Sequence, residues 1–240
     1  MKTGVVIPVK DEPRFARVVE NFARAGGPAA LGVWEVVAVD DGSTDRSVFA
    51  PAVRAGFTVL RHDESRGVGA AIRTGLLHLR ARGGEVAVVM AGNGKDDPAE
   101  IPRLLDAIER GADYVQGSRY LEGGRFDNLP PLRRVLTRLV PWAWSIWFLR
   151  RLTEITNGFR AYRLALLERP EIRIEQDWLD TYELEYYLQY RVLEMRCDYR
   201  EVPVSKIYPT DGMPVSKIRL TKDLWRLLRP FVYLALRVKS

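Results

Sequence analysis

The sequence predicts an α/β fold in which a mostly parallel sheet is flanked by helices, and three observations support this prediction. Across residues 1–120, short apolar runs alternate with segments of helical periodicity, as parallel strands joined by crossover helices require. The apolar runs are continuous, which is typical of strands buried on both faces. Polar and acidic residues directly follow several of these runs, and the ligands of open α/β sheets bind at such strand ends.

The elements of this half follow one another in regular order. Apolar residues at helical spacing, such as Phe15, Val18 and Phe22, mark the helices, and polar or glycine-containing clusters end the apolar runs. We predict strands at Gly4–Val9, Trp34–Val39, Thr58–Leu60, Val86–Met90 and Tyr114–Gln116. We predict helices at Pro13–Ala25, Gly67–Arg80 and Ala99–Arg110.

The pattern changes after Arg119. Residues Leu129–Ile155 are rich in Leu, Trp and Arg, and a polar turn follows them. Because the chain has no internal repeat, we expect one domain, residues 1–220, with a C-terminal elaboration. Its later elements are predicted as a helix at Thr181–Leu193, a strand at Tyr199–Val204, a loop at Ile207–Lys217 and an amphipathic helix within residues 221–240.

The composition suits a globular protein with an anionic partner. Of the 240 residues, 47% are hydrophobic, and the formal net charge is +6, which favours nucleotides or an anionic membrane surface. The single cysteine, Cys197, excludes an internal disulfide and suits a reducing compartment. The first residues lack the apolar core of a signal peptide, and no stretch reaches the ~20 apolar residues of a spanning helix. We therefore expect a cytoplasmic protein.

Polar clusters lie where nucleotides bind in α/β folds. Asp11 and Glu12 follow the first strand, and a cluster that begins with Asp40 and Asp41 follows the second. These carboxylates can accept hydrogen bonds from a ribose or from a base N–H, although the second cluster is also typical of a turn with a helix N-cap. A glycine-rich helix start at Gly67 can let the backbone approach a phosphate, but none of these motifs is specific alone.

In number and order, the motifs resemble those of family 2 glycosyltransferases with a GT-A fold, particularly the polyprenyl-phosphate, dolichol-phosphate mannose synthase-like branch. The resemblance covers nearly the whole chain. It implies an inverting transfer from a nucleoside-diphosphate sugar to a polyprenyl phosphate or membrane-linked glycan, with Mg²⁺ or Mn²⁺ as cofactor. Residues 1–120 would bind the donor and residues 121–220 the acceptor. Further matches are Gln116–Arg119, Thr156–Ala161, Glu183–Glu185, Glu201–Val204 and Ser216–Ile218.

The resemblance also implies roles for single residues. A guanidinium suits a phosphate because its planar fork donates two parallel hydrogen bonds, although for Arg133 a solvated surface charge is the alternative. The residues implied to bind the nucleotide sugar are Pro8, Val9, Glu12, Asp41, Gly67, Asn93 and Lys217. Those implied to contact the acceptor or a phosphate are Arg119, Arg133, Asn157 and Arg160.

The end of the fourth strand departs from the family pattern. Members usually place two carboxylates here, as Asp-X-Asp, whereas this chain has Ala91 and Asn93 at the matching positions. Hard divalent cations prefer oxygen ligands. Ala91 offers none, and the amide oxygen of Asn93 is neutral. This loop therefore decides how the protein works.

Three interpretations of the loop stay open. In the first, the donor diphosphate holds the cation together with Asn93 and either Asp96 or Asp97. In the second, Lys95, which stands where the family often has a metal-supporting Gln, replaces the cation as a fixed charge. In the third, a natural or engineered change at position 91 impairs catalysis. Asp97 before Pro98 is also typical of a helix N-cap followed by proline at the first helical position.

An acceptor hydroxyl would need a general base, whereas an acceptor phosphate is already anionic near neutral pH. The candidates are Asp180, Glu183 and Glu185. On a helix, Glu183 and Glu185 point to different faces, so only one of them can face the cleft. Glu185 matches the recurrent Glu of the family best, and a capping or ion-paired acid is the alternative for each.

The segment Val140–Leu149 contains three of the six tryptophans and is flanked by arginines. It is too short to span a bilayer, but Trp and Arg are favoured at a bilayer interface. We therefore expect a peripheral protein at the inner face of the membrane, with helix packing or a homodimer contact as the alternative use of this segment. No nucleic-acid reader motif accompanies the basic residues.

Two rival functions come from other classes. Ala91 favours a nucleotide-sugar-binding subunit without catalytic activity. A nucleotidyltransferase can share the same α/β pattern, but it usually carries glycine directly after the first strand, where residues 8–13 have none.

Overall fold

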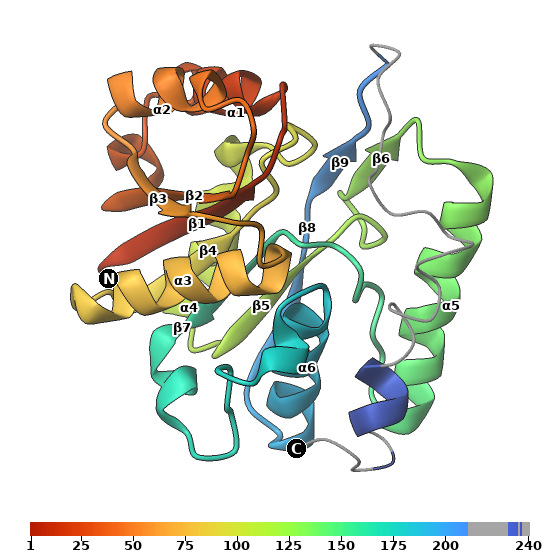
Figure 1. Cartoon of the computed structure of the whole chain (residues 1–240). Helices are drawn as coiled ribbons and strands as arrows, with labels where there is room; N and C mark the ends of the chain where they lie inside the picture. The colour runs from red at the N-terminus through yellow and green to blue at the C-terminus, as the bar shows by residue number, and fades with distance from the viewer. Residues whose placement is uncertain (211–229, 235, 237–240) are drawn as a thin grey trace.

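Figure 1 shows the computed structural model, which describes residues 1–210, 230–234 and 236, except for the side chains of Leu132 and Arg133. A seven-stranded sheet in the order β3-β2-β1-β4-β7-β5-β8 forms its centre, and β6 pairs with β9 in a second sheet. The strands are β1 (Thr3–Val9), β2 (Glu35–Asp41), β3 (Thr58–His62), β4 (Val86–Val89), β5 (Tyr114–Ser118), β6 (Arg125–Asp127), β7 (Arg160–Arg163), β8 (Tyr199–Pro203) and β9 (Ser205–Ile207).

Helices cover both faces of the central sheet, with α3 on one side and α1 and α2 on the other in Figure 1. The α-helices are α1 (Phe15–Arg24), α2 (Ala50–Arg54), α3 (Val68–Ala81), α4 (Ile101–Glu109), α5 (Pro131–Trp147) and α6 (Glu183–Glu194). Short 3₁₀ turns are η1 (Ala29–Leu31), η2 (Ser47–Phe49), η3 (Pro98–Glu100), η4 (Leu164–Glu168) and η5 (Asp177–Leu179).

Two buried clusters hold these layers together, because successive strand residues point to opposite faces of a sheet. Gly75 lets α3 lie close to the sheet: a Cβ at this position would come within 2.5 Å of Val6 Cγ1. The cluster that joins the sheet to α3 and α6 includes Val6, Val37, Leu76 and Leu184. The cluster on the opposite face, with α1 and α4, includes Val5, Val36, Phe22 and Leu104.

The predicted α/β class is confirmed, with one correction to the sheet. The strands and helices predicted for residues 1–120 are all present, and their ends shift by a few residues. However, β7 lies antiparallel between β4 and β5, in a segment where the sequence suggested only a polar turn and a motif. The reason is that β7 has four residues and begins and ends with arginine, so it lacks an apolar run.

The helix α5 forms most of the Leu-, Trp- and Arg-rich segment and lies to the side of the sheet, at the right of Figure 1. Its inner face packs on α6, where the rings of Trp144 and Phe148 lie 6.0 and 5.2 Å from the ring of Tyr190. Its outer face is apolar and exposed, and we call the residues Val135, Leu139, Trp142 and Ile146 the α5 stripe. Their spacing of four, three and four residues places them on one helical face.

The C-terminal prediction is tested only in small part. Residues 230–234 are helical, and Phe231 packs on Trp144 with ring centroids 4.9 Å apart. Most of the predicted loop Ile207–Lys217 and of the predicted helix within 221–240 lies outside the described residues. None of the helices in the described part of the chain has the length and apolar character needed to cross a bilayer.

Candidate functional site

The loops after β1, β2, β4 and β5 meet at one edge of the sheet, which we call the carboxyl edge. Asp11, after β1, has a φ of +42°, which is uncommon for a residue other than glycine. Its carboxylate accepts hydrogen bonds of 2.8 Å from both the N–H and the Oγ1 of Thr44, after β2. Gly92, after β4, lies against β1, since a Cβ there would meet Val9 Cγ2 at 2.9 Å and the Pro8 oxygen at 3.1 Å. Pro8 and Val9 therefore lie beside the loop that departs from the family pattern.

The two carboxylates expected near the nucleoside differ in how strongly the fold engages them. Glu12 is half-buried, and its Oε1 accepts a 3.2 Å hydrogen bond from the backbone N–H of Arg14. Asp41 is buried and holds the loop after β3 in place. Its carboxylate accepts hydrogen bonds of 2.8–2.9 Å from Ser65 Oγ, Arg66 N and Gly67 N, and its Oδ1 lies 2.8 Å from His62 Nδ1.

These contacts determine the charge state of Asp41. Burial alone would raise the pKa of its carboxyl group, but the hydrogen bonds from Arg66, His62, Ser65 and Gly67 outweigh burial and leave the pKa below its ordinary value. Asp41 is therefore a carboxylate at neutral pH, and it orients the backbone that enters α3. Its contact with a nucleoside stays a prediction.

The glycines at the start of α3 make room for another part of the chain. Gly67 has a φ of +110°, and a Cβ there would come within 2.3 Å of the carbonyl oxygen of Asp180. A Cβ on Gly69 would come within 2.0 Å of the carbonyl oxygen of Leu179. The Asp180 carboxylate in turn accepts a 2.5 Å hydrogen bond from the guanidinium of Arg73 on α3. The glycine-rich start thus brings Asp180, a candidate base, next to α3.

The loop after β4 is built around an ion pair. Asp96 is 1% exposed, and its Oδ1 lies 2.5 Å from the ammonium nitrogen of Lys206, which is 7% exposed and belongs to β9. Its Oδ2 accepts a 3.0 Å hydrogen bond from the N–H of Ala91. The predicted N-cap is confirmed, since Asp97 Oδ1 accepts a 3.0 Å hydrogen bond from Ala99 N.

These residues fit a divalent cation poorly. Ala91 supplies no side-chain oxygen, and Lys206 and a backbone N–H engage the two oxygens of Asp96. Asp97 caps η3, so Asn93 is left with a single neutral amide oxygen. In the part of the chain that the structure describes, no group of three or more His, Cys, Asp and Glu side chains could hold a metal ion.

Tyr208 connects this loop to the end of β5. Its ring centroid lies 4.8 Å from the ammonium nitrogen of Lys95, and its hydroxyl accepts a 3.3 Å hydrogen bond from Arg119. Arg119 is 3% exposed and donates a 2.7 Å hydrogen bond to Glu154. Burial alone would lower the pKa of the Arg119 guanidinium, but the charge of Glu154, together with the interactions with Tyr208 and Tyr120, outweighs burial and raises it. The charged guanidinium of Arg119 and the ammonium of Lys95 thus contact the same side chain, that of Tyr208.

Asn157 and Arg160 form a second buried network, beside β5. The Asn157 side chain donates a 3.0 Å hydrogen bond to the Gly117 oxygen, and the backbone carbonyl oxygen of Asn157 accepts a 2.6 Å hydrogen bond from Arg160. Arg160 donates a 2.8 Å hydrogen bond to Tyr114 and lies 3.3 Å from Glu185 Oε1. Two of the candidate bases, Asp180 and Glu185, therefore each face an arginine. The third, Glu183, is fully buried on α6 beside Thr181.

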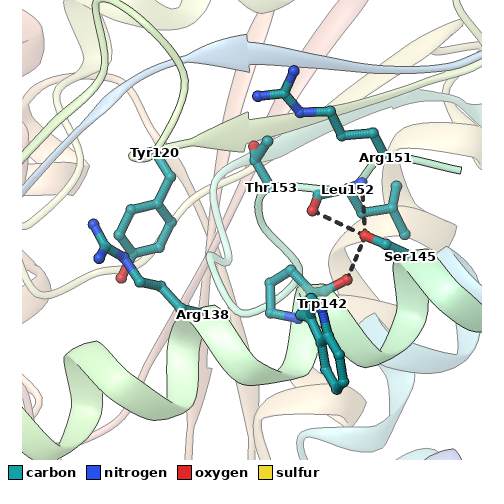
Figure 2. Close-up of a pocket in the computed structure, with 8 residues that line it drawn as sticks. Tyr120, Arg138, Trp142, Ser145, Arg151, Leu152 and Thr153 are labelled. Carbon is teal, nitrogen blue, oxygen red and sulfur yellow. Dashed lines mark hydrogen bonds between the residues drawn. The ribbon is translucent and has the colours of Figure 1, made fainter.

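A cavity of about 500 Å³ lies between α5 and the segment Arg151–Thr153. Figure 2 shows that it combines cationic, aromatic and hydroxyl groups. The guanidinium of Arg138 lies 5.1 Å from the ring centroid of Tyr120, the residue that follows Arg119. Ser145 ties the two walls together, because its hydroxyl accepts a 3.0 Å hydrogen bond from Leu152 N. The lining residues are Tyr120, Arg138, Pro141, Trp142, Ser145, Arg151, Leu152 and Thr153.

Several of these residues were not singled out from the sequence. Lys206, Tyr208 and Glu154 carry no motif of their own, and their partners are far away along the chain. For Arg138 and Trp142, the signal was the Trp- and Arg-rich composition of their segment. Lys217 and the side chain of Arg133 lie outside the described residues, so their predicted roles stay predictions.

Comparisons with known proteins agree with this architecture. The family model described as Glycosyl transferase family 2 matches residues 4–169. The chain is 32% identical over 219 residues to an undecaprenyl-phosphate mannosyltransferase of Micrococcus luteus, with 85% of this chain and 83% of the relative covered. It is 30% identical over 210 residues to a polyprenol monophosphomannose synthase of Mycolicibacterium smegmatis, with 85% and 77% covered.

Solved structures show the same fold. A glucosyl-3-phosphoglycerate synthase of Mycobacterium tuberculosis, in complex with Mn²⁺, UDP and glucosyl-3-phosphoglycerate, has a TM-score of 0.65 to this chain. The two are 17% identical, and the match covers 95% of this chain and 79% of that one. The likeness confirms the predicted GT-A type of sheet and carries no further conclusion at this level of identity.

Proposed function

Since the chain belongs to glycosyl transferase family 2, we propose that it transfers a sugar from a nucleoside-diphosphate sugar to the phosphate of a polyprenyl phosphate at a membrane surface. Two relatives named for transfer to such carriers match over 85% of this chain and support the acceptor class. The observation that carries the proposal is the cavity beside α5, which offers guanidinium groups and an aromatic wall in one space.

The cavity suits a molecule that is anionic at one end and apolar at the other. Arg138 and Arg151 are both exposed and line it, so their guanidinium groups are accessible to a phosphate. Trp142 and Leu152 give the same cavity an apolar wall, against which a prenyl chain would bury hydrocarbon surface. A water-soluble glycan has no comparable hydrocarbon surface to bury against that wall.

The α5 stripe supports a location at a lipid surface. Trp142 belongs both to the cavity and to the stripe, and it is 64% exposed. The stripe continues along α5 through Leu139 and Val135, with Arg134 and Arg138 beside it. Apolar and basic residues in this arrangement favour an anionic bilayer interface. We propose that α5 rests on the inner face of the membrane, so that the lipid carrier enters the cavity from the bilayer.

The donor is proposed to bind at the carboxyl edge within residues 1–120. Pro8 and Val9 end β1, Glu12 follows it, and Asp41 holds the loop that leads into α3. The acceptor half would then be residues 121–220, and Tyr208 and Arg119 would lie between the two halves. This arrangement brings two substrates together, which by itself lowers the barrier of a bimolecular reaction.

In the proposed step, an oxygen of the acceptor phosphate attacks the anomeric carbon of the sugar. The bond from that carbon to the donor diphosphate breaks, and its electron pair stays on the released nucleoside diphosphate. A phosphate acceptor needs no general base, and this suits a site in which Asp180 and Glu185 each face an arginine. Attack in line with the leaving group would invert the anomeric centre.

The test is turnover by the purified chain with UDP-, GDP- and dTDP-sugars, each combined with a polyprenyl phosphate, the matching prenyl alcohol or no acceptor. Mass spectrometry of the lipid fraction should detect a polyprenyl-phosphate sugar in the first case only. A product on the prenyl alcohol, or hydrolysis alone, would contradict the proposed acceptor. Donor binding without any product would favour a binding subunit.

A variant pair links the activity to the cavity. The double variant Arg138→Gln/Arg151→Gln should raise KM for polyprenyl phosphate by about tenfold or more, since a charged hydrogen bond contributes about 1.5–3 kcal/mol, and should leave KM for the donor unchanged. Arg110→Gln is the matched control, because Arg110 is the exposed residue after α4 and, among the described residues, forms an ion pair with Asp106 alone.

A further inference from the structure

We infer that the ammonium group of Lys206, held on Asp96 and assisted by Lys95, supplies the positive charge that binds the donor diphosphate, in place of a divalent cation. The inference rests on the proposed function for the nature of the donor, and it adds Lys206 and a metal-independent mode of binding. It starts from the poor fit between the residues of the β4 loop and a divalent cation.

Lys206 occupies the position that a divalent cation in the β4 loop would need. Asp96 is the buried carboxylate of this loop, and the Lys206 nitrogen already lies 2.5 Å from its Oδ1. A divalent cation bound to Asp96 would have to displace this ammonium and then lie next to it. Two like charges at such a short distance repel each other, and more strongly in a buried site than in water. The ion pair therefore disfavours a metal at the position where the loop could otherwise bind one.

The ammonium group of Lys206 has hydrogen-bond donors beyond the one that Asp96 accepts. A lysine ammonium has three N–H donors, and among the described residues Asp96 is its one hydrogen-bond partner. Because Lys206 is 7% exposed, bulk water reaches it poorly. Two donors of a buried cation are thus available for an anionic ligand, and a diphosphate offers acceptor oxygens of the opposite charge.

Lys95 provides a second ammonium group where the β4 loop joins β9. The N–H of Ile207, next to Lys206, donates a 3.1 Å hydrogen bond to the carbonyl oxygen of Lys95, so β9 and the β4 loop are joined. The Lys95 ammonium lies over the Tyr208 ring and is 6% exposed. Lys95 and Lys206 thus bring two buried ammonium groups to the place where the β4 loop joins β9.

The two ammonium groups can stabilise the leaving group of the proposed reaction. When the bond to the anomeric carbon breaks, the departing nucleoside diphosphate gains negative charge. Ammonium groups that the fold already holds in place stabilise this charge without reorganisation. The lack of carboxylates at Ala91 and Asn93 is then compatible with catalysis, because the lysines supply the positive charge that a metal ion bound to two carboxylates would supply.

The experiment measures binding of UDP and GDP to the full chain by calorimetry, with EDTA or with Mn²⁺. For whichever nucleotide binds, the affinity should agree within about twofold between the two conditions, and Lys206→Met should weaken it by about tenfold or more. Lys2→Met is the matched control, since Lys2 contacts Trp34 and Arg82 at the opposite end of β1. Its affinity should equal that of the wild type.

A double variant distinguishes a purely structural role of Lys206 from binding of the diphosphate by its ammonium group. Lys206→Met leaves Asp96 buried without its partner, and such a loss can disturb the loop by itself. Asp96→Asn/Lys206→Met removes both charges and retains an oxygen for the N–H of Ala91. If the ammonium binds the diphosphate, this double variant stays as weak as Lys206→Met. If Lys206 only holds the loop, the double variant regains wild-type affinity, and the inference is wrong.

The outcomes also separate this inference from the proposed function. Binding that disappears in EDTA and returns with Mn²⁺ overturns the metal-independent site but leaves the proposed transferase intact. Binding that persists in EDTA and needs Lys206, without transfer to polyprenyl phosphate, supports the site and contradicts the proposed function. Absence of nucleotide binding under all conditions overturns both.

Discussion

The carboxyl edge of the sheet and the outer face of α5 use their side chains in opposite ways. At the carboxyl edge, charged groups are buried and matched, as Asp41, Asp96 and Arg119 show. On α5, the side chains of Trp142 and Ile146 are more than half exposed to solvent. The first region uses polar residues to fix the shape of its loops, whereas the second leaves apolar residues available to a partner. Substitutions at the carboxyl edge should therefore lower stability, whereas those on the outer face of α5 should change binding with little effect on stability.

The largest loss of stability is expected at the Arg119–Glu154 pair. Both side chains are at most 2% exposed, so Arg119→Met would leave an unpaired buried carboxylate. We expect the free energy of unfolding to fall by about 3–5 kcal/mol, measured by urea denaturation. Arg24→Met should cost less than about 0.5 kcal/mol, because its ion pair with Glu20 is exposed.

A second variant distinguishes loss of the pair from loss of packing. Arg119→Met/Glu154→Gln removes both charges, and the new amide oxygen at position 154 would still accept hydrogen bonds from the N–H groups of Ile155 and Thr156, as the Glu154 carboxylate does. Most of the lost stability should return. If the double variant is as unstable as Arg119→Met, the charge balance of the carboxyl edge is not what holds Arg119 in place.

A smaller and pH-dependent loss is expected for Asp41→Asn. Burial alone would raise the pKa of Asp41, but its hydrogen bonds lower it below the ordinary value. The folded state therefore binds fewer protons at this site than the unfolded state. Its contribution is fully present above the unfolded pKa of about 3.9 and is lost as the pH falls through the folded pKa. Asp41→Asn should cost about 1–3 kcal/mol near neutral pH, and its difference from the wild type should narrow below about pH 4.

Glu201 gives the opposite trend and serves as the comparison. Burial outweighs its hydrogen bonds with Thr153 and Glu154 and raises the pKa of its carboxyl group. The folded state therefore binds protons more readily than the unfolded state, and the wild type gains stability from this site as the pH falls. As the pH falls, the stability of the wild type should rise relative to that of Glu201→Gln and should fall relative to that of Asp41→Asn. Parallel pH curves for the two variants would contradict these assignments.

The sequence predicts elements whose signal is local. The strands and helices within residues 1–120 follow from apolar runs and helical spacing, and the N-cap at Asp97 follows from the proline after it. In contrast, β7 consists of Arg, Ala, Tyr and Arg. It lies between β4 and β5, and its Arg160 can be buried there because it reaches Tyr114, Asn157 and Glu185. Such a strand depends on tertiary partners, which no local pattern contains.

The same distinction applies to the candidate site. The position of the β4 loop at a strand end is predictable, and so is its lack of metal-binding carboxylates. The Lys206–Asp96 pair is not predictable, since 110 residues separate the two side chains. Glu185 and Asp180 are recognisable as candidate acids from their neighbours along the chain. That each of them faces an arginine depends on how α3, β7 and α6 pack.

The smallest effect on stability and a clear effect on binding are expected together at Trp142. Because its side chain is 64% exposed, Trp142→Ala should change the free energy of unfolding by less than about 0.5 kcal/mol. It should nevertheless weaken binding to anionic vesicles by about tenfold, since the indole would lose its burial in the bilayer interface. Trp34→Ala is the matched control, because Trp34 is also exposed but lies away from α5, against Lys2 and Arg82. Equal vesicle binding by Trp142→Ala and Trp34→Ala would contradict the proposal that α5 contacts the membrane. Dimers that dissociate in Trp142→Ala would instead assign the stripe to a second copy of the chain.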